Sequence, residues 1–363
     1  MKLKIKTITL KEMTSRSAKG AGNNKLLPLT ELMCIREKDG KLVMITSDGT
    51  NYLYIFQDGV EVEEGFYVTV KAEQFAKLVS KLTCESVEMS LVGTALEVNG
   101  NGVYKIDIPV DEEGDVITYP DPYENMPLSN NPSQIQLATI KSILECCKAS
   151  LAQTLEVPCY TGYYCGARVV ATDNDKMSSM KVRLFENDVL VPAEVFNLVD
   201  VMTAEKIDFQ FVGEYLVFTS PDCVVIGMPM DGIEDYPIEP ISELLEQDME
   251  SSCTINRNSF ISLLERIMLF VGPYDDKAIR LTFTENGIAV QSIQSNGVET
   301  IPYVNVDNFK PFTCLADITF LLAEAKSIQS DALKMQYGQD NAIRFDDGNI
   351  TIVVSLLADT QGE

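Results

Sequence analysis

The stretch VTVKAEQFAKLVSKLTCESVEMSLVGTALEVNGNGVYKIDIPV, residues 68–110, decides the fold because its pattern occurs three times in the chain. Its apolar periodicity predicts a strand, a short helix and then three alternating strands. The same outline returns in residues 189–230 and 313–357. A phenylalanine marks the helix of each copy, and these anchors are Phe75, Phe196 and Phe320. Their spacing of about 120 residues is too long for a solenoid repeat and predicts a triplicated domain.

The chain of 363 residues can form three domains of ordinary size. We place these domains at residues 1–127, 128–250 and 251–363. Residues 124–134, rich in Pro, Asn and Ser, and the acidic residues 243–253 are interpreted as linkers between them. Each copy also begins with a helical pattern. We therefore expect an α+β fold in which every domain packs two helices on one side of an antiparallel sheet.

The composition argues against catalysis. Histidine is absent, which excludes Ser-His-Asp and Cys-His chemistry and histidine-ligated zinc. No Gly-rich phosphate loop of common spacing is found, and the acidic clusters lie in turn-rich segments typical of solvated loops. We predict no catalytic residue, no metal site and no cofactor.

The cellular setting follows from the cysteines and from the hydrophobic pattern. The nine cysteines are an odd number, lie mostly in apolar runs and form no CxxC pair, so we expect reduced, buried thiols. The N-terminus does not resemble a signal peptide, and no apolar run is long enough to span a membrane. We predict a soluble cytoplasmic protein without a membrane partner.

The net charge of -25 argues at first against a nucleic-acid partner. The predicted helices nevertheless place Gln74, Lys77 and Lys81 on one polar face, and such side chains suit contacts with phosphates that do not read the sequence. Exposed lysines on helices are also ordinary solvated residues, and that reading stays open for each one. The predicted DNA-facing residues are Lys77, Lys81, Lys141, Lys148, Arg266 and Lys326.

Three segments resemble a known family. Residues 26–49 (LLPLTELMCIREKDGKLVMITSDG), 167–177 (ARVVATDNDKM) and 279–292 (IRLTFTENGIAVQS) are similar to segments of the first, second and third domains of the bacterial sliding clamp, the beta subunit of DNA polymerase III. The likeness extends over essentially the whole chain in the right order. It implies a head-to-tail homodimer that closes as a ring around duplex DNA, with helices lining the hole and sheets forming the outer wall.

The same resemblance implies an apolar pocket between the second and third domains that binds short peptides of the polymerase and of the clamp loader. Carried over residue by residue, the pocket contains Tyr160, Thr161, Thr172, Met177, Asp317, Phe320, Val353, Val354, Ser355, Leu356 and Leu357. The family's Gly-His-Arg is Asn174-Asp175-Lys176 here, so we expect a more acidic rim. The alternative is that residues 353–357 are only the last strand of a sheet.

Ring closure, by the same resemblance, pairs an edge strand of the first domain with the third domain of the other chain. The implied contact residues are Tyr104, Ile106, Ile108, Leu269 and Phe270. An edge strand with alternating large apolar residues invites pairing with another chain. These side chains could equally face the core of their own domain.

Three functions remain open on the sequence alone. The first is a processivity clamp for DNA replication. The second is a clamp-like interaction hub or inhibitor that binds clamp partners without encircling DNA, which the poor basic face of the second copy favours. The third, a carboxylate-based hydrolase, would need paired carboxylates in a cleft, and the repeats offer none.

Overall fold

The computed structural model describes residues 1–363 except 112, 273–276, 295, 340 and 359–363. Its contacts divide the chain into two compact units. Unit 1 contains Met1–Ile140 and Glu194–Pro229, and unit 2 contains Lys141–Ala193 and Met230–Glu363. Each unit therefore includes part of the second repeat.

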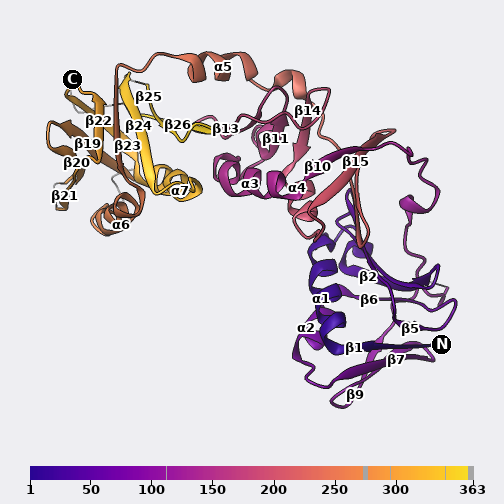
Figure 1. Ribbon diagram of the computed structural model, residues 1–363. Coiled ribbons are helices and arrows are strands. Elements are labelled where there is room, and N and C mark those ends of the chain that lie inside the picture. The colour runs from indigo at the N-terminus through magenta and orange to yellow at the C-terminus, as the bar shows by residue number, and fades with distance from the viewer. Residues whose placement is uncertain (112, 273–276, 295, 340, 359–363) are drawn as a thin grey trace. The chain divides into compact units, whose positions relative to one another are not determined.

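Unit 1 contains two antiparallel sheets (Figure 1). The eight-stranded sheet joins the first two repeats where β17 pairs with β4, so that Val224 lies opposite Tyr54. Its order is β10 (Ser133–Gln136), β15 (Lys206–Val212), β16 (Tyr215–Ser220), β17 (Cys223–Gly227), β4 (Tyr52–Gln57), β3 (Lys41–Ser47), β2 (Leu32–Lys38) and β6 (Tyr67–Lys71). The five-stranded sheet has the order β5 (Glu61–Val62), β1 (Lys2–Lys6), β7 (Ser86–Val92), β8 (Ala95–Asn99) and β9 (Val103–Asp107).

Unit 2 repeats this plan with a nine-stranded and a four-stranded sheet. Here β13 of the second repeat pairs with β26 of the third. The larger sheet has the order β14 (Val189–Pro192), β11 (Gly162–Cys165), β12 (Val169–Thr172), β13 (Lys176–Met180), β26 (Ile350–Ser355), β25 (Ala342–Asp346), β24 (Ala332–Gln339), β18 (Ser251–Asn256) and β22 (Asn305–Asn308). The smaller has the order β21 (Val298–Ile301), β20 (Gly287–Ser292), β19 (Ala278–Thr284) and β23 (Phe312–Asp317).

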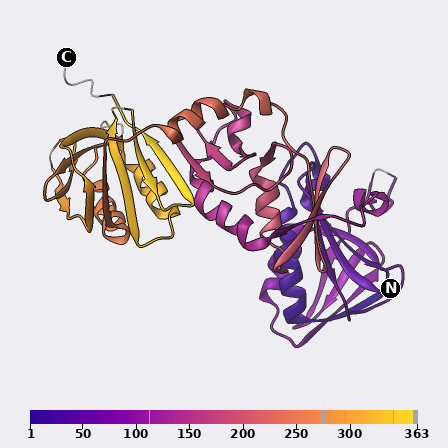
Figure 2. The same cartoon turned by 45° about the horizontal axis from the view of Figure 1, so that its top comes forward.

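In the first and third repeats the two helices pair as the sequence predicts. In unit 1, α1 (Thr7–Ser17) packs on α2 (Ala72–Lys81) and contacts strands of both sheets, and Figure 2 shows this helical layer on one side of the strands. In unit 2, α6 (Arg257–Met268) packs on α7 (Ile318–Ser327) in the same way. The other α-helices are α3 (Leu137–Cys147), α4 (Ala193–Val199) and α5 (Ile238–Glu246), and the 3-10 helices are η1 (Ala18–Gly20), η2 (Pro28–Glu31), η3 (Pro122–Asn125), η4 (Lys148–Ser150), η5 (Pro158–Thr161) and η6 (Ile233–Asp235).

Helix α2 buries Phe75 as its fourth residue and exposes its lysines, as its amphipathic pattern requires. The fourth residue of α7 is Leu321, which is fully buried. The sequence alignment that made Phe320 the equivalent of Phe75 is therefore wrong by one residue. Phe320 is only partly buried, and its ring is available for another contact.

The interpretation of residues 243–253 as a linker is wrong at both ends, because α5 extends to Glu246 and β18 begins at Ser251. Apolar residues spaced by about one helical turn, Ile238, Ile241 and Leu245, give this segment an apolar face. All nine cysteines are unpaired, and seven of them are buried. Within the described part of the chain, none of the helices has both the length and the apolar character needed to cross a membrane.

Candidate functional site

Side chains from four neighbouring strands of unit 2 form a row on one face of the nine-stranded sheet. Thr172 lies opposite Met177, Met177 opposite Val353, and Val353 opposite Arg344. Residues that lie directly opposite each other in antiparallel strands project from the same face. All four are buried, and three of them pack side by side on β12, β13 and β26. Thr172, Met177 and Val353 of this row form a mostly apolar floor built from the second and third repeats.

Helix α5 covers part of this floor. Ile241 is buried in one hydrophobic cluster with Met177 and Val353. The helix starts after Pro237 and has Pro240 in its first turn, where a proline is tolerated because those positions have no intrahelical hydrogen bond to lose. Its apolar face therefore packs toward the sheet.

A hollow of about 110 Å³ lies between the floor and the helix. Its wall is largely apolar, and among the described residues that line it Lys176 is the one with a charge. The lining residues are Tyr160, Thr172, Asn174, Lys176, Met177, Pro237, Pro240, Ile241, Leu244, Val353 and Ser355. A small apolar hollow edged by a few polar groups suits one or two large side chains of a short peptide.

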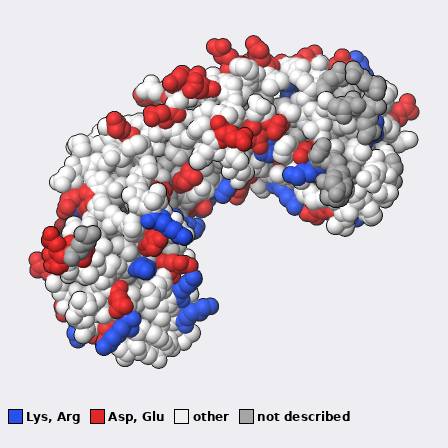
Figure 3. Space-filling view, turned by 180° about the vertical axis from the view of Figure 1, so that it is seen from behind, with Lys and Arg blue, Asp and Glu red and all other residues white. Residues whose placement is uncertain are grey.

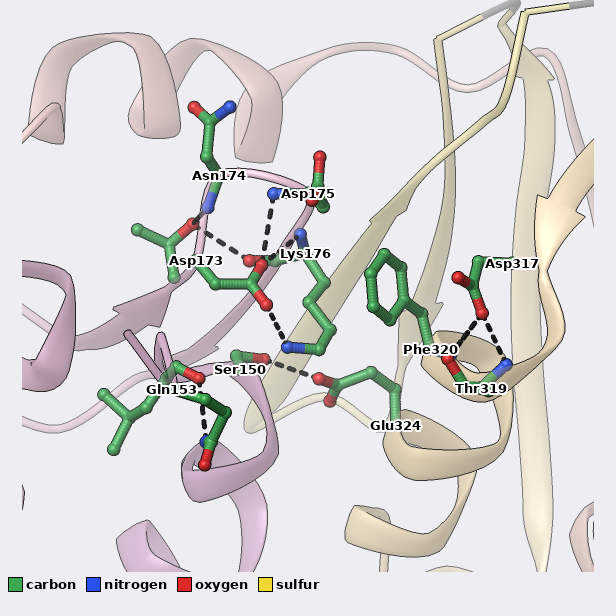
Figure 4. A network of polar contacts seen from close by, with 12 residues as sticks. Ser150, Gln153, Asp173, Asn174, Asp175, Lys176, Asp317, Thr319, Phe320 and Glu324 are labelled. Carbon is green, nitrogen blue, oxygen red and sulfur yellow. Dashed lines mark hydrogen bonds and ion pairs between the residues drawn. The ribbon is translucent and has the colours of Figure 1, made fainter. Parts of the chain in front are cut away.

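The turn between β12 and β13 forms the polar edge of the hollow (Figure 4). The carboxylate of Asp173 accepts hydrogen bonds from the backbone N–H groups of Asp175 and Lys176, at 3.1 and 3.0 Å. Asn174 has φ 84°, a left-handed conformation that asparagine tolerates better than most residues. The turn thereby directs the Lys176 side chain into the protein, toward Asp173 and the ring of Phe320.

Lys176 is 7% exposed, and its positive charge is balanced by a carboxylate within the protein. Its ammonium forms an ion pair with Asp173, and it lies 5.2 Å from the centroid of the Phe320 ring. Figure 4 shows the aliphatic stem of Lys176 next to that ring and the Glu324 carboxylate nearby. The one cation in the lining is thus not free to attract an anionic ligand strongly.

Glu324 of α7 is fully buried behind this edge. Its carboxylate accepts hydrogen bonds from the hydroxyls of Ser150, at 2.8 Å, and Ser178, at 3.3 Å. Burial raises its pKa to about 7, although these serines and Lys176 favour the charged form. The network connects α7 of the third repeat to η4 and β13 of the second.

Some of the predicted pocket residues line the hollow and others lie elsewhere. Those that line the hollow are Tyr160, Thr172, Met177, Val353 and Ser355. Val354 points to the opposite face of β26 and is fully buried. Phe320 lies behind the hollow against Lys176.

The remaining predicted pocket residues have other contacts. The Asp317 carboxylate caps α7 by accepting from the N–H groups of Thr319 and Phe320. The Thr161 hydroxyl donates to the carbonyl of Pro158 at 2.8 Å. Beyond β26, the N–H of Leu356 donates to Asn341 and that of Leu357 to Leu315, and Leu357 is 37% exposed.

Sequence reasoning missed the α5 side of the hollow because the segment 238–246 was not recognised as a helix and its last part was interpreted as a linker. The residues missed on this side are Pro237, Pro240, Ile241 and Leu244, whereas Asn174 and Lys176 line the hollow at the rim where the resemblance placed them. The apolar spacing in IEPISELLE is the signal that identifies the helix.

The six predicted DNA-facing cations are all exposed on helices or at helix ends. Among these cations, Lys77 forms an ion pair with Glu73, Arg266 with Glu299 and Lys326 with Glu265, each on its own unit. Lys81, Lys141 and Lys148 are exposed on α2, α3 and η4. Figure 3 shows basic and acidic side chains intermixed on the face that it draws.

The predicted ring contacts also differ among themselves. Strand β9 is an edge strand, as ring closure requires. Ile106 and Ile108 are 3% and 7% exposed and face the core of their own unit, so only the backbone edge and side chains such as Tyr104 are open there. Leu269 and Phe270 are 80% and 49% exposed.

Solved structures with this arrangement of strands and helices are numerous. The DNA polymerase III beta chain of Streptococcus pneumoniae aligns with a TM-score of 0.85 at 16% identity, over 98% of this chain and 99% of its own. The fold is that of a bacterial sliding clamp. The beta subunit of Borrelia burgdorferi, solved with a natural product, aligns with a TM-score of 0.86 at 15% identity, over 99% of this chain and 100% of its own.

A third structure of this fold carries a ligand. The sliding clamp of Pseudomonas aeruginosa, bound to griselimycin, aligns with a TM-score of 0.81 at 15% identity, over 99% of both chains. No protein-family model matches the sequence, and no curated protein matches it either. The clamp fold is therefore carried by a sequence that shares only 15 to 16% identity with these three structures.

Proposed function

We propose that this chain is a DNA sliding clamp, a ring-shaped processivity factor that encircles duplex DNA without reading its sequence. The observation that carries the proposal is the likeness to clamps over 98% or more of this chain and of the matched chains. Such a protein needs no catalytic group. It acts as a topological link, so weak phosphate contacts leave it free to slide.

The ring requires two copies of the chain. Three domains, at residues 1–127, 128–250 and 251–363, would form half of it, and a head-to-tail homodimer would close it. Support comes from the open edge of β9 and from the exposed Leu269 and Phe270 at the end of α6. As a DNA-replication protein, such a ring would act in the cytoplasm.

The hollow beside α5 would hold short peptides of the polymerase and of the clamp loader. Its apolar lining and small volume support this role. The clamp of Caulobacter crescentus was solved with PEG at its putative tethering region, and that of Pseudomonas aeruginosa with griselimycin. Tethering the polymerase would turn each release from the primer end into rapid rebinding, because its effective concentration stays high.

The proposal is tested by retention on DNA. The purified protein, loaded on nicked circular DNA, should co-elute with the circle at low salt and should be lost once the DNA is cut to a linear form. Equal retention on circular and linear DNA, or a monomer in sedimentation at micromolar concentration, would contradict a closed ring. The pocket is tested separately with an anchor peptide, fluorescein-labelled Gly-Ser-Leu-Ser-Leu-Phe-Gly, and with a control peptide in which serine replaces its apolar anchors.

A further inference from the structure

Arg344 of β25 continues the row that forms the floor of the hollow. It lies opposite Val353 on one side and opposite Gln336 on the other. Its side chain is only 8% exposed. It does not itself line the hollow, whose floor ends at Val353.

The guanidinium of Arg344 contacts the C-terminal end of α5. Its Nη2 donates to the backbone carbonyls of Leu244 and Gln247, at 2.7 and 2.8 Å. Its Nη1 lies 3.4 Å from the side-chain oxygen of Gln336. Carbonyls at a helix C-terminus have no intrahelical partner and carry partial negative charge, so a cation there satisfies both needs.

This contact matters because α5 cannot hold its own position. A helix of nine residues is too short to be stable alone in water, so its place depends on tertiary contacts. Pro240, Ile241 and Leu244 of this helix form the wall of the hollow. Whatever fixes the end of α5 also fixes the distance between that wall and the floor.

The environment of Arg344 is otherwise costly. Burial lowers the pKa of its guanidinium, although nearby Asp346 and Asp248 favour the charged form. Its Nε is buried without a hydrogen-bond partner in the described part of the chain. The two carbonyls of the α5 end therefore compensate much of the desolvation of this cation.

We propose that Arg344 is the positioning residue of the peptide pocket, holding α5 at the distance from the sheet that an apolar anchor side chain needs. The inference rests on the proposed function. It assigns to one buried arginine, outside the lining, control over the width of the site.

The test compares three variants of the full chain in binding the anchor peptide by fluorescence anisotropy. Arg344→Met nearly keeps the volume but removes both charge-assisted hydrogen bonds to α5, so affinity should fall by at least about tenfold, which is the effect of losing one such bond. Arg344→Lys keeps the charge without the planar fork, so its affinity should lie between those of Arg344→Met and wild type. Asn256→Ala removes the cap that Asn256 gives to Ser259 in α6 and serves as a control for general destabilisation of unit 2, with affinity unchanged.

Amide hydrogen exchange supplies the readout that a merely structural role would not move. Arg344→Met should speed exchange in Ile238–Glu246 and leave α6 unchanged, whereas Asn256→Ala should do the reverse. If Arg344→Met cannot be purified folded, Arg344→Lys carries the test by both readouts. Wild-type affinity in Arg344→Lys would then overturn the proposal.

The possible results separate the two claims. If the wild type binds the anchor peptide and Arg344→Met binds it equally well, the positioning role of Arg344 is overturned and the pocket stands. Equal losses of affinity in Arg344→Met and Asn256→Ala would also overturn it, because general destabilisation would then explain the loss. If the wild type binds neither peptide, the pocket itself fails, and this inference fails with it.

Discussion

Arg266 of α6 and Glu299 of β21 form a bidentate ion pair. The guanidinium Nε lies 2.8 Å from Oε1 of Glu299, and Nη2 lies 2.6 Å from Oε2. The hydrogen bond raises the pKa of Arg266 and lowers that of Glu299. Lys326 and Lys77 have similar acidic partners. On the proposed function, phosphates would have to compete with carboxylates for these cations, so we expect weak binding to DNA.

Removing the competitor should strengthen DNA binding. In Glu299→Gln, Arg266 is released for a phosphate, and each additional phosphate contact should steepen the plot of log affinity against log salt by about 0.9. The measurement is retention on nicked circular DNA over a salt series. Glu285→Gln, which removes an exposed acid at the β19–β20 turn of the same unit, is the control. An identical gain in both variants would show that net charge alone acts, and that Arg266 does not face DNA.

Met177 and Val354 provide a matched test of the pocket. Met177 is 4% exposed but lines the hollow, so in Met177→Lys the ammonium can reach water through it. We expect a melting temperature close to wild type and loss of anchor-peptide binding by at least about tenfold, because a charge would sit where an apolar anchor must go.

Val354→Lys should behave in the opposite way. Val354 points into a closed core on the other face of β26 and is fully buried. A lysine there should cost several kcal/mol, on the order of 3 or more, and lower the melting temperature sharply. If Met177→Lys melts as early as Val354→Lys, Met177 belongs to a closed core and the hollow is not a binding site.

The repeat pattern predicted the sheets and helix pairs because burial imposes periods that are visible in one sequence. The prediction failed where a side chain packs against a residue of another repeat. Phe320 appeared to be a core anchor, yet Leu321 occupies that place and Phe320 contacts Lys176 of a different repeat. The α5 wall was missed for a related reason, since its acidic residues suggested a linker and Arg344, which holds it, lies about 100 residues further along the chain.

The exposed end of α6 should be needed for dimerisation and not for folding. Leu269 is 80% exposed, so Leu269→Asp should leave the melting temperature of the protomer nearly unchanged and dissociate the ring. Ile106→Asp should instead destabilise unit 1 by several kcal/mol, on the order of 3, since Ile106 is 3% exposed in its core. Sedimentation velocity and thermal melting of the two variants separate these effects. A Leu269→Asp protein that stays dimeric at the wild-type concentration would remove α6 from the interface.

Glu324 should make the stability of unit 2 depend on pH. Its folded pKa is raised to about 7, above the value of about 4.3 expected for an unfolded glutamate. The folded state therefore holds a proton that the unfolded state has released. Its stabilising contribution is complete below about pH 4 and is lost as pH rises through about 7.

Glu324→Gln stays neutral at every pH and keeps an oxygen that can accept from Ser150. The free energy of unfolding of this variant minus that of wild type should increase as pH rises from about 4 to about 7, by roughly 3 kcal/mol at most, and then level off. Urea unfolding of both proteins across this range measures the difference, and other titrating groups cancel because both chains share them. Charge pairing with Lys176 is the competing effect, since it favours the ionised carboxylate. If Lys176 dominated, the difference would fall with rising pH, and that sign would show that Glu324 is held as a buried anion and not as a neutral acid.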